Sequence, residues 1–282
     1  MSDAPTSTRR RFLTIAAGST AIGLAGCLGG DSGGSPTDEE PMADDEMTDD
    51  GMDDTMTDGG DEMTEGDDMM SVTFTVTVEN VSEPGTITTG AGDEVAVPLS
   101  PGAWAVHDDM ATAFSPGSAA SAGLEALAED GSPGTYADEL AGADHVEKTG
   151  TFTTPDGANG PAPIFPGETY SFDVKAHAGQ RLSLATMFVQ SNDLFYAFEP
   201  TGLSLFEDDQ PISGDVTDRL LLWDAGTEQN QEPGAGADQA PRQSGPDTGA
   251  DEMGTIRTID EVDDMYQYPD VSEVIKVTVT QM

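Results

Sequence analysis

Residues 72–78 read VTFTVTV, and residues 274–280, near the end of the chain, read VIKVTVT. In both stretches apolar side chains alternate with β-branched polar ones at a period of two, which is the pattern of a strand with one face buried. Because the two stretches share this pattern and bound the same region, we expect them to pair or to pack as neighbours. Such a contact would close a single all-β unit.

Further segments between these two stretches are also rich in apolar and β-branched residues, and clusters of Gly, Pro, Asn and Asp separate them. The segments lie near 95–99 and 151–153, at 170–174 and 182–189, near 203–206 and at 219–223. Short strands with turn residues between them predict an antiparallel β-sandwich of about eight strands, over residues 71–282.

Two segments depart from the strand pattern. Residues 118–128 read SAASAGLEALA, which predicts a short helix over one end of the sheets, with Ser118 as its N-cap, and a second helical turn is expected around 137–141. Residues 229–254 are rich in Gly, Pro and Gln and nearly free of large apolar side chains. They predict a long loop, and long loops in compact domains are often functional.

The charge of the chain excludes one class of partner. Its 282 residues include 10 Lys+Arg and 54 Asp+Glu, for a formal net charge of −44. Nucleic-acid surfaces need clustered Lys and Arg, so we expect no nucleic-acid partner and no docking on anionic lipid by charge. At about 1 M salt the Debye length is only about 3 Å, and repulsion among the acids is screened. We interpret the acidic surface as halophilic adaptation; the alternative is an ordinary acidic secreted protein.

The first 26 residues have the parts of an export signal. Arg9 and Arg10 precede a short apolar run at 13–24, which is shorter than the roughly 20 residues of a spanning helix. The paired arginines resemble a twin-arginine signal, and residues 24–27, LAGC, resemble a lipobox with Cys27 as the lipidated residue. Cys27 is the only cysteine of the chain, which excludes an intrachain disulfide. We therefore expect export and attachment to the outer face of the cytoplasmic membrane by the lipid anchor alone.

Residues 28–70 predict a tether between Cys27 and the folded domain. The segment is dense in Asp and Glu, has no Lys or Arg, and contains few large apolar groups other than Met. High net charge with low hydrophobicity favours an extended, disordered chain. Its methionines raise the alternative of a soft-metal site, but their spacing is irregular and no His or Cys accompanies them.

No catalytic motif stands out in the sequence. It contains no Gly-x-Ser-x-Gly elbow, no glycine-rich phosphate loop and no His-Glu-x-x-His, and His107, His145 and His177 are far apart. We therefore predict that the protein is not an enzyme. Two alternatives stay open: a hydrolase of extracellular polysaccharide or peptide that uses acids of the 229–254 region, and a solute-capture lipoprotein with an apolar pocket.

Two blocks of the sequence, 187–197 and 213–228, each place an aspartate directly after a hydrophobic strand, where the chain turns. These residues are Asp193 and Asp224. Carboxylates at the ends of neighbouring strands can converge on a hard cation, and calcium takes six to eight oxygen ligands from carboxylates, carbonyls and water.

The same blocks resemble the spondin amino-terminal domain family, of the F-spondin and mindin type, in its prokaryotic secreted branch. The family pattern is a Ser-Pro-Asp-Trp-Phe-like turn followed by Trp/Tyr-Asp-Ala-Gly-Thr-Asp/Glu. Here residues 191–195 read SNDLF and residues 223–228 read WDAGTE, with Asn192 in place of Pro and Leu194 in place of Trp. The resemblance covers roughly 72–282, and it implies an antiparallel sandwich with a calcium ion near one end.

The resemblance also implies a set of calcium ligands. Asp193 and Asp224 match the two strand-end aspartates of the family, and Asp173 matches the upstream acidic ligand once one residue is gapped. The backbone carbonyl of Leu221 is a further candidate ligand. As in the animal relatives, such a domain would bind a partner at the cell surface in adhesion; here the partner would be an extracellular protein or polysaccharide whose identity the sequence does not give.

Overall fold

The computed structural model describes residues 71–282. The predicted export signal with Arg9 and Arg10, the predicted lipidation site Cys27 and the predicted tether all lie outside the described residues. None of the helices in the described part is long and apolar enough to cross a membrane.

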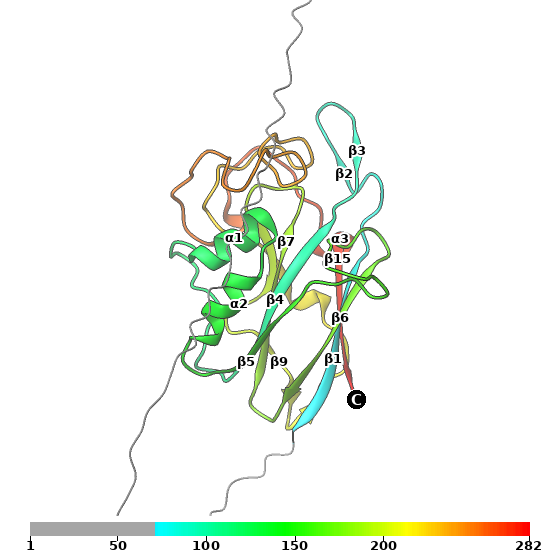
Figure 1. Ribbon diagram of the computed structural model, residues 1–282, viewed down its shortest axis with the longest axis vertical. Coiled ribbons are helices and arrows are strands. Elements are labelled where there is room, and N and C mark those ends of the chain that lie inside the picture. Colours follow the sequence, from blue (N-terminus) through cyan, green and yellow to red (C-terminus); the bar gives the residue numbers. More distant parts are fainter. Residues whose placement is uncertain (1–70) are drawn as a thin grey trace, which may run out of the picture. The chain divides into compact units, whose positions relative to one another are not determined.

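The strand at the start of the described region pairs with the strand at its end, as predicted. They are antiparallel, with Asn80 opposite Ile275 and Phe74 opposite Gln281. Both belong to a four-stranded sheet (Figure 1). Its order is β12 (Gly214–Asp215), β15 (Ile275–Gln281), β1 (Val72–Asn80) and β6 (Thr169–Ala176).

A second, seven-stranded sheet completes the β-sandwich. Its order is β14 (Arg257–Thr258), β13 (Leu220–Asp224), β8 (Leu194–Phe198), β7 (Arg181–Phe188), β4 (Leu99–His107) and β5 (Val146–Phe152), with β9 (Leu203–Ser204) also paired to β7. Two small hairpins stand apart: β2 (Ile87–Thr88) with β3 (Glu94–Val95), and β10 (Phe206–Glu207) with β11 (Gln210–Pro211). The predicted antiparallel β-sandwich is therefore confirmed.

The predicted strand near 95–99 was wrong. The chain leaves β3 at Val95 and enters β4 only at Leu99, since Pro98 has no N–H to give to a ladder. The long strand β4 escaped prediction because Pro101 and Gly102 interrupt its pattern. Its pairing with β7 shifts register between Leu99 and Gly102, which accommodates these residues.

Alternation along the strands of the large sheet separates two cores. On β8, Leu194, Tyr196 and Phe198 pack between the two sheets, whereas Phe195 and Ala197 face the opposite side. Fully burying such a large apolar side chain stabilises the fold by roughly 1.5–3 kcal/mol. The helices α1 (Ala122–Asp130) and α2 (Gly134–Ala141) cover this second side.

The prediction that a helix lies over one end of the sheets was wrong: α1 and α2 pack on the outer face of the large sheet (Figure 1). The sheet offers small side chains there, including Ala103, Ala105 and Ala185, and this leaves room for Leu124 and Leu127 of α1.

Helix α1 begins three residues later than predicted. Its N-cap is Ser121, whose Oγ accepts a hydrogen bond from the Leu124 amide at 3.2 Å, rather than Ser118. It ends at Gly131, whose φ of 65° is left-handed.

Three shorter helical turns complete the unit. They are η1 (Thr217–Arg219), η2 (Ile259–Glu261) and α3 (Val271–Val274). The strand predicted at 274–280 begins one residue later, at Ile275, because Val274 is the last residue of α3. A capping box of Asp270 and Glu273 stabilises the start of this helix.

Residues 229–254 form the predicted long loop and contain no helix or named strand. The loop lies at one end of the unit, beside α1 (orange in Figure 1). Gln243 Nε2 ties it to α1 by donating to Asp130 Oδ1 at 2.7 Å.

Candidate cation site

The register between β8 and β13 brings Asp193 and Asp224 together. Asp193 directly precedes β8, Asp224 ends β13, and Leu194 lies opposite Asp224 in the antiparallel pair. The Ala225 amide donates to the Asp193 carbonyl at 3.2 Å, which continues the ladder past the last strand residue. Carboxylate oxygens of Asp193, Asp224 and Glu252 lie within 4.8 Å of one another. We call these three residues the β8–β13 acid cluster.

Asp193 is fully buried and uses only one of its two carboxylate oxygens. Oδ2 accepts from the Thr227 amide at 2.7 Å, from the Thr227 hydroxyl at 3.2 Å and from the Glu228 amide at 3.1 Å. Oδ1 is buried and has no hydrogen-bond partner within residues 71–282. Leaving a buried acceptor unpaired costs about 1–3 kcal/mol, and more for a charged group, so a cation bound at this oxygen would be stabilising.

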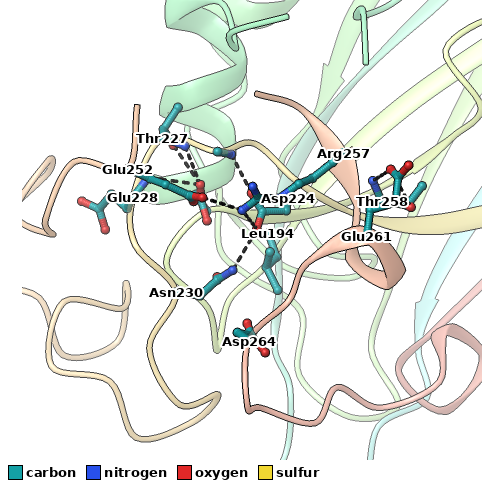
Figure 2. Close-up of polar contacts among 12 residues, drawn as sticks. Leu194, Asp224, Thr227, Glu228, Asn230, Glu252, Arg257, Thr258, Glu261 and Asp264 are labelled. Atoms are coloured by element: carbon teal, nitrogen blue, oxygen red, sulfur yellow. Dashed lines mark hydrogen bonds and ion pairs between the residues drawn. The ribbon is translucent and has the colours of Figure 1, made fainter. Parts of the chain in front are cut away.

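Asp224 is also fully buried, but both of its oxygens are held. Oδ1 accepts from the Gly226 amide at 2.7 Å, and Oδ2 accepts from Asn230 Nδ2 at 2.8 Å and from Arg257 Nη2 at 3.2 Å (Figure 2). The Gly226 contact requires a sharp turn, and the φ of 71° at this residue suits glycine. These contacts fix the Asp224 carboxylate in one orientation.

Glu252 is the third member of the cluster, and it lies near the end of the long loop at 229–254. Its Oε1 accepts from Arg257 Nη2 at 2.6 Å, whereas its Oε2 is buried without a partner in the described chain. The cluster therefore holds two unpaired buried carboxylate oxygens, one on Asp193 and one on Glu252.

Burial shapes the electrostatics of the site. Loss of solvent raises the pKa of Asp193, and the neighbouring negative charge of Asp224 raises it further. Burial also raises the pKa of Asp224, although Arg257 and Asn230 oppose that rise. Burial is the largest cause of both shifts, and a positive charge beside the carboxylates would oppose them.

The residues present fit a hard divalent cation. All three candidate ligands are carboxylates, which are the donors that Ca²⁺ and Mg²⁺ prefer. When the three carboxylates are ionised, the Arg257 guanidinium balances one of them, and two negative charges remain. A divalent ion would balance the remaining charge and would give the two free oxygens a partner.

The structure does not bring Asp173 into this cluster, in contrast to the ligand set that the resemblance implied. Asp173 lies on β6, at the edge of the other sheet, where it is exposed and accepts from Thr75 Oγ1 at 2.7 Å. Strand alternation explains this placement, because Val174 takes the buried position and turns Asp173 outward.

Leu221 is also too far along its strand to serve as a ligand. It precedes Asp224 by three residues on β13 and pairs with Ala197 of β8. Three strand residues span about 10 Å, whereas a calcium–oxygen bond is about 2.3–2.6 Å long. The carbonyl of Leu221 therefore lies outside the reach of an ion held by the cluster.

Sequence reasoning missed Glu252, Asn230 and Arg257. The unusual loop at 229–254 was the only signal for Glu252 and Asn230, and nothing in the sequence pointed to Arg257 on the two-residue strand β14. No protein-family model matches the chain, and no curated protein matches it either.

Proposed function

We propose that residues 71–282 form a calcium-stabilised β-sandwich that acts as a binding module, which a lipid on Cys27 holds at the outer cell surface. The observation that supports calcium is the β8–β13 acid cluster with its two unpaired buried oxygens, on Asp193 and Glu252. The resemblance of residues 191–195 and 223–228 to the spondin amino-terminal domain favours the same ion and an adhesion role. The partner would be an extracellular protein or polysaccharide.

Calcium would act on the loops through the residues that hold it. Asp193 and Asp224 belong to the ends of two strands, and Glu252 belongs to the end of the long loop. A shared ion would tie the loop to the rigid sheet edge. Ordering a binding loop before it meets its partner lowers the entropy cost of association, so the ion would strengthen binding without touching the partner.

The β8–β13 acid cluster itself is unsuited to hydrolysis, although the hydrolase alternative was predicted on acids of the 229–254 region. Glycoside hydrolysis needs two carboxylates on either side of a bound sugar, roughly 5–9.5 Å apart. Asp193 and Asp224 are both fully buried. A polymer cannot reach carboxylates that solvent does not reach, whereas a small cation can be enclosed there.

A cavity gives the solute-capture alternative a specific observation in its favour. The cavity has a volume of about 420 Å³ and lies beside the C-terminal end of α1. Most of its lining is apolar and includes Pro98, Phe165, Met187 and Val189. A small apolar ligand would fit this volume. Binding of an apolar fluorescent dye to the wild type, weakened at least tenfold in Val189→Asp, would favour solute capture; equal binding to both would remove it.

Thermal unfolding with and without calcium tests the proposed function. At a free calcium concentration about 100 times the Kd, the ion should stabilise the fold by about 2.7 kcal/mol, which raises the Tm by roughly 5–10 °C. A chelator should reverse the shift. Asp193→Asn should abolish the part of the shift that this ion contributes, without lowering the Tm measured in chelator, because the amide carries no buried charge. Asp173→Asn is the matched control and should keep the full shift.

Equal melting temperatures of the wild type in calcium and in chelator would overturn the metal part of the proposal. A calcium shift that Asp193→Asn leaves unchanged would place the ion elsewhere on the protein and would equally overturn this site.

A further inference from the structure

A second group of carboxylates lies near the β8–β13 acid cluster but shares no residue with it. Oxygens of Glu129, Glu228 and Asp247 lie within 4.8 Å of one another. The three residues come from different parts of the fold: the last turn of α1, the segment after β13, and the long loop. We call them the α1–loop acid cluster. Proximity of acids alone is common on an acidic protein, so the surroundings of each carboxylate decide whether it marks a site.

Glu129 is the decisive member, because the residue is largely buried and no positively charged side chain of the described residues pairs with it. The residue is only 4 % exposed, and none of the ion pairs formed by residues 71–282 includes it. It lies in the last turn of α1, where the helix dipole disfavours negative charge. Burial raises the pKa of Glu129 to about 7, and the charges of Glu228 and Asp247 contribute to that rise.

The Thr227 hydroxyl lies beside Glu129, but it is neutral and cannot balance the negative charge of the Glu129 carboxylate. Thr227 is the neighbour that lowers the pKa of Glu129 through a side-chain hydrogen bond. A threonine hydroxyl has a single proton, however, and this one is directed to Asp193 Oδ2 at 3.2 Å. Glu129 therefore shares its one hydrogen-bond donor with Asp193, and its carboxylate lies beside two further acids, Glu228 and Asp247.

Hydrogen bonds hold both carboxylate oxygens of Glu228, and this carboxylate lies next to those of Glu129 and Asp247. It is 2 % exposed; its Oε1 accepts from the Gly249 amide at 2.7 Å, and its Oε2 accepts from Asn192 Nδ2 at 3.1 Å. Asp247, by contrast, is exposed, so the cluster has one wall open to solvent. Two preset buried carboxylates and one exposed carboxylate are a suitable arrangement for an ion that enters from water.

We propose that Glu129, Glu228 and Asp247 bind a second divalent cation of the hard, oxygen-preferring class, with calcium as the ion to test. The ion would fasten the C-terminal end of α1 to the long loop. The ion would thereby reinforce the hydrogen bond from Gln243 of the loop to Asp130, which is the residue after Glu129 on α1.

The two acid clusters share the backbone that separates them. The amides of Thr227 and Glu228 donate to Asp193, in the β8–β13 acid cluster, while the side chain of Glu228 belongs to the α1–loop acid cluster. In the turn before β8, Asn192 donates to Glu228, and its neighbour Asp193 belongs to the β8–β13 acid cluster. An ion bound in one acid cluster therefore orders residues that also hold the ligands of the other cluster. We expect the two ions to bind with positive cooperativity for this reason.

Calorimetric titration of the chelator-treated full chain with calcium chloride tests the second site. About 1 M KCl should be present to screen weak association with the acidic residues 28–70. Wild type should take up one more ion per chain than Glu129→Gln and one more than Asp193→Asn. Glu125→Gln, one turn earlier on α1, is the matched control and should bind as many ions as wild type.

Asp247→Asn keeps the test decisive if Glu129→Gln fails to fold, because Asp247 is exposed. This variant should weaken the second binding event at least tenfold. Equal stoichiometry and affinity in wild type, Glu129→Gln and Asp247→Asn would overturn the second site. Loss of an ion in Glu129→Gln but not in Asp193→Asn would support the second site and would overturn the first, so the two proposals fail separately.

Discussion

Arg257 lies directly opposite Asp224 in the antiparallel pair of β13 and β14, and its Nη2 is 3.2 Å from Asp224 Oδ2. The same nitrogen is 2.6 Å from Glu252 Oε1. One guanidinium thus holds two of the three acids of the β8–β13 acid cluster in place before any ion arrives. It also supplies one of the positive charges that the buried carboxylates need.

Replacing Arg257 should therefore have opposite effects on stability and on calcium binding. In Arg257→Gln the metal-free fold should lose about 1–3 kcal/mol, since Asp224 stays buried with one charged donor fewer. Calcium affinity should rise by roughly three- to tenfold, because the site loses the positive charge that repels the ion. Chemical denaturation in chelator and calorimetric titration with calcium measure the two effects. Arg219→Gln, whose exposed side chain forms an ion pair with the exposed Asp218, should change neither.

Weaker calcium binding in Arg257→Gln would contradict this reading of the charge balance. It would mean that Arg257 acts chiefly by positioning Asp224 and Glu252, and that its positive charge does not limit the affinity.

A glycine in β4 tests the packing of the large sheet. A Cβ on Gly102 would overlap the Phe152 ring and the Ala185 carbonyl, whereas a Cβ on Gly160 would meet no atom within 4 Å. Gly102→Ala should destabilise the fold by about 1–3 kcal/mol, as overpacking in a well-filled core does. Gly160→Ala should stay within about 0.5 kcal/mol of wild type. Equal denaturation midpoints for the two variants would show that β4 does not pass as close to β5 and β7 as described.

His107 should make the fold sensitive to acid. The ring is 1 % exposed; Nδ1 donates to the Asp108 carbonyl at 2.7 Å, and Nε2 accepts from Ser183 Oγ at 2.8 Å. Burial lowers the pKa of His107 below 6.5, so the folded state resists protonation more than the unfolded state does. The stability from neutral His107 is complete above about pH 6.5 and is lost as the pH falls toward the folded pKa.

The measurement is the free energy of unfolding between pH 7.5 and pH 5 in chelator. Buried carboxylates with raised pKa values act with the opposite sign in this range, so the quantity to compare is the difference between variants. His107→Gln should lose less stability on acidification than wild type. An equal fall in the free energy of unfolding for wild type and His107→Gln would show that His107 is not the cause of the acid sensitivity.

The sequence predicted the fold best where alternation was uninterrupted. Residues 72–78 carry a period-two pattern, and they became β1 and paired with β15 as expected. Strand β4 was missed because Pro101 and Gly102 break the pattern, and only the register shift against β7 accommodates them. The position of the helices also could not be read from the chain, because it depends on alanines from several strands meeting on one face.

Some residues of the candidate site could likewise be predicted from the sequence, and others could not. Asp193 and Asp224 could be named from the sequence, because each follows a hydrophobic strand and the register of β8 with β13 then places them together. Asp173 shares the acidic character but lies on a strand of the other sheet, and its outward orientation follows from the burial of Val174. Glu252 lies in a loop and Arg257 on the two-residue strand β14, and neither segment has a periodic pattern from which the residue could be predicted.

A crystal structure of the protein grown with calcium chloride tests the central claim most directly. The account predicts an ion between Asp193, Asp224 and Glu252, at about 2.3–2.6 Å from carboxylate oxygens that include Asp193 Oδ1, with further oxygen ligands to a total of six to eight. Asp193 Oδ1 bound instead to a water molecule or a protein donor, with no ion among the three carboxylates at saturating calcium, would contradict it.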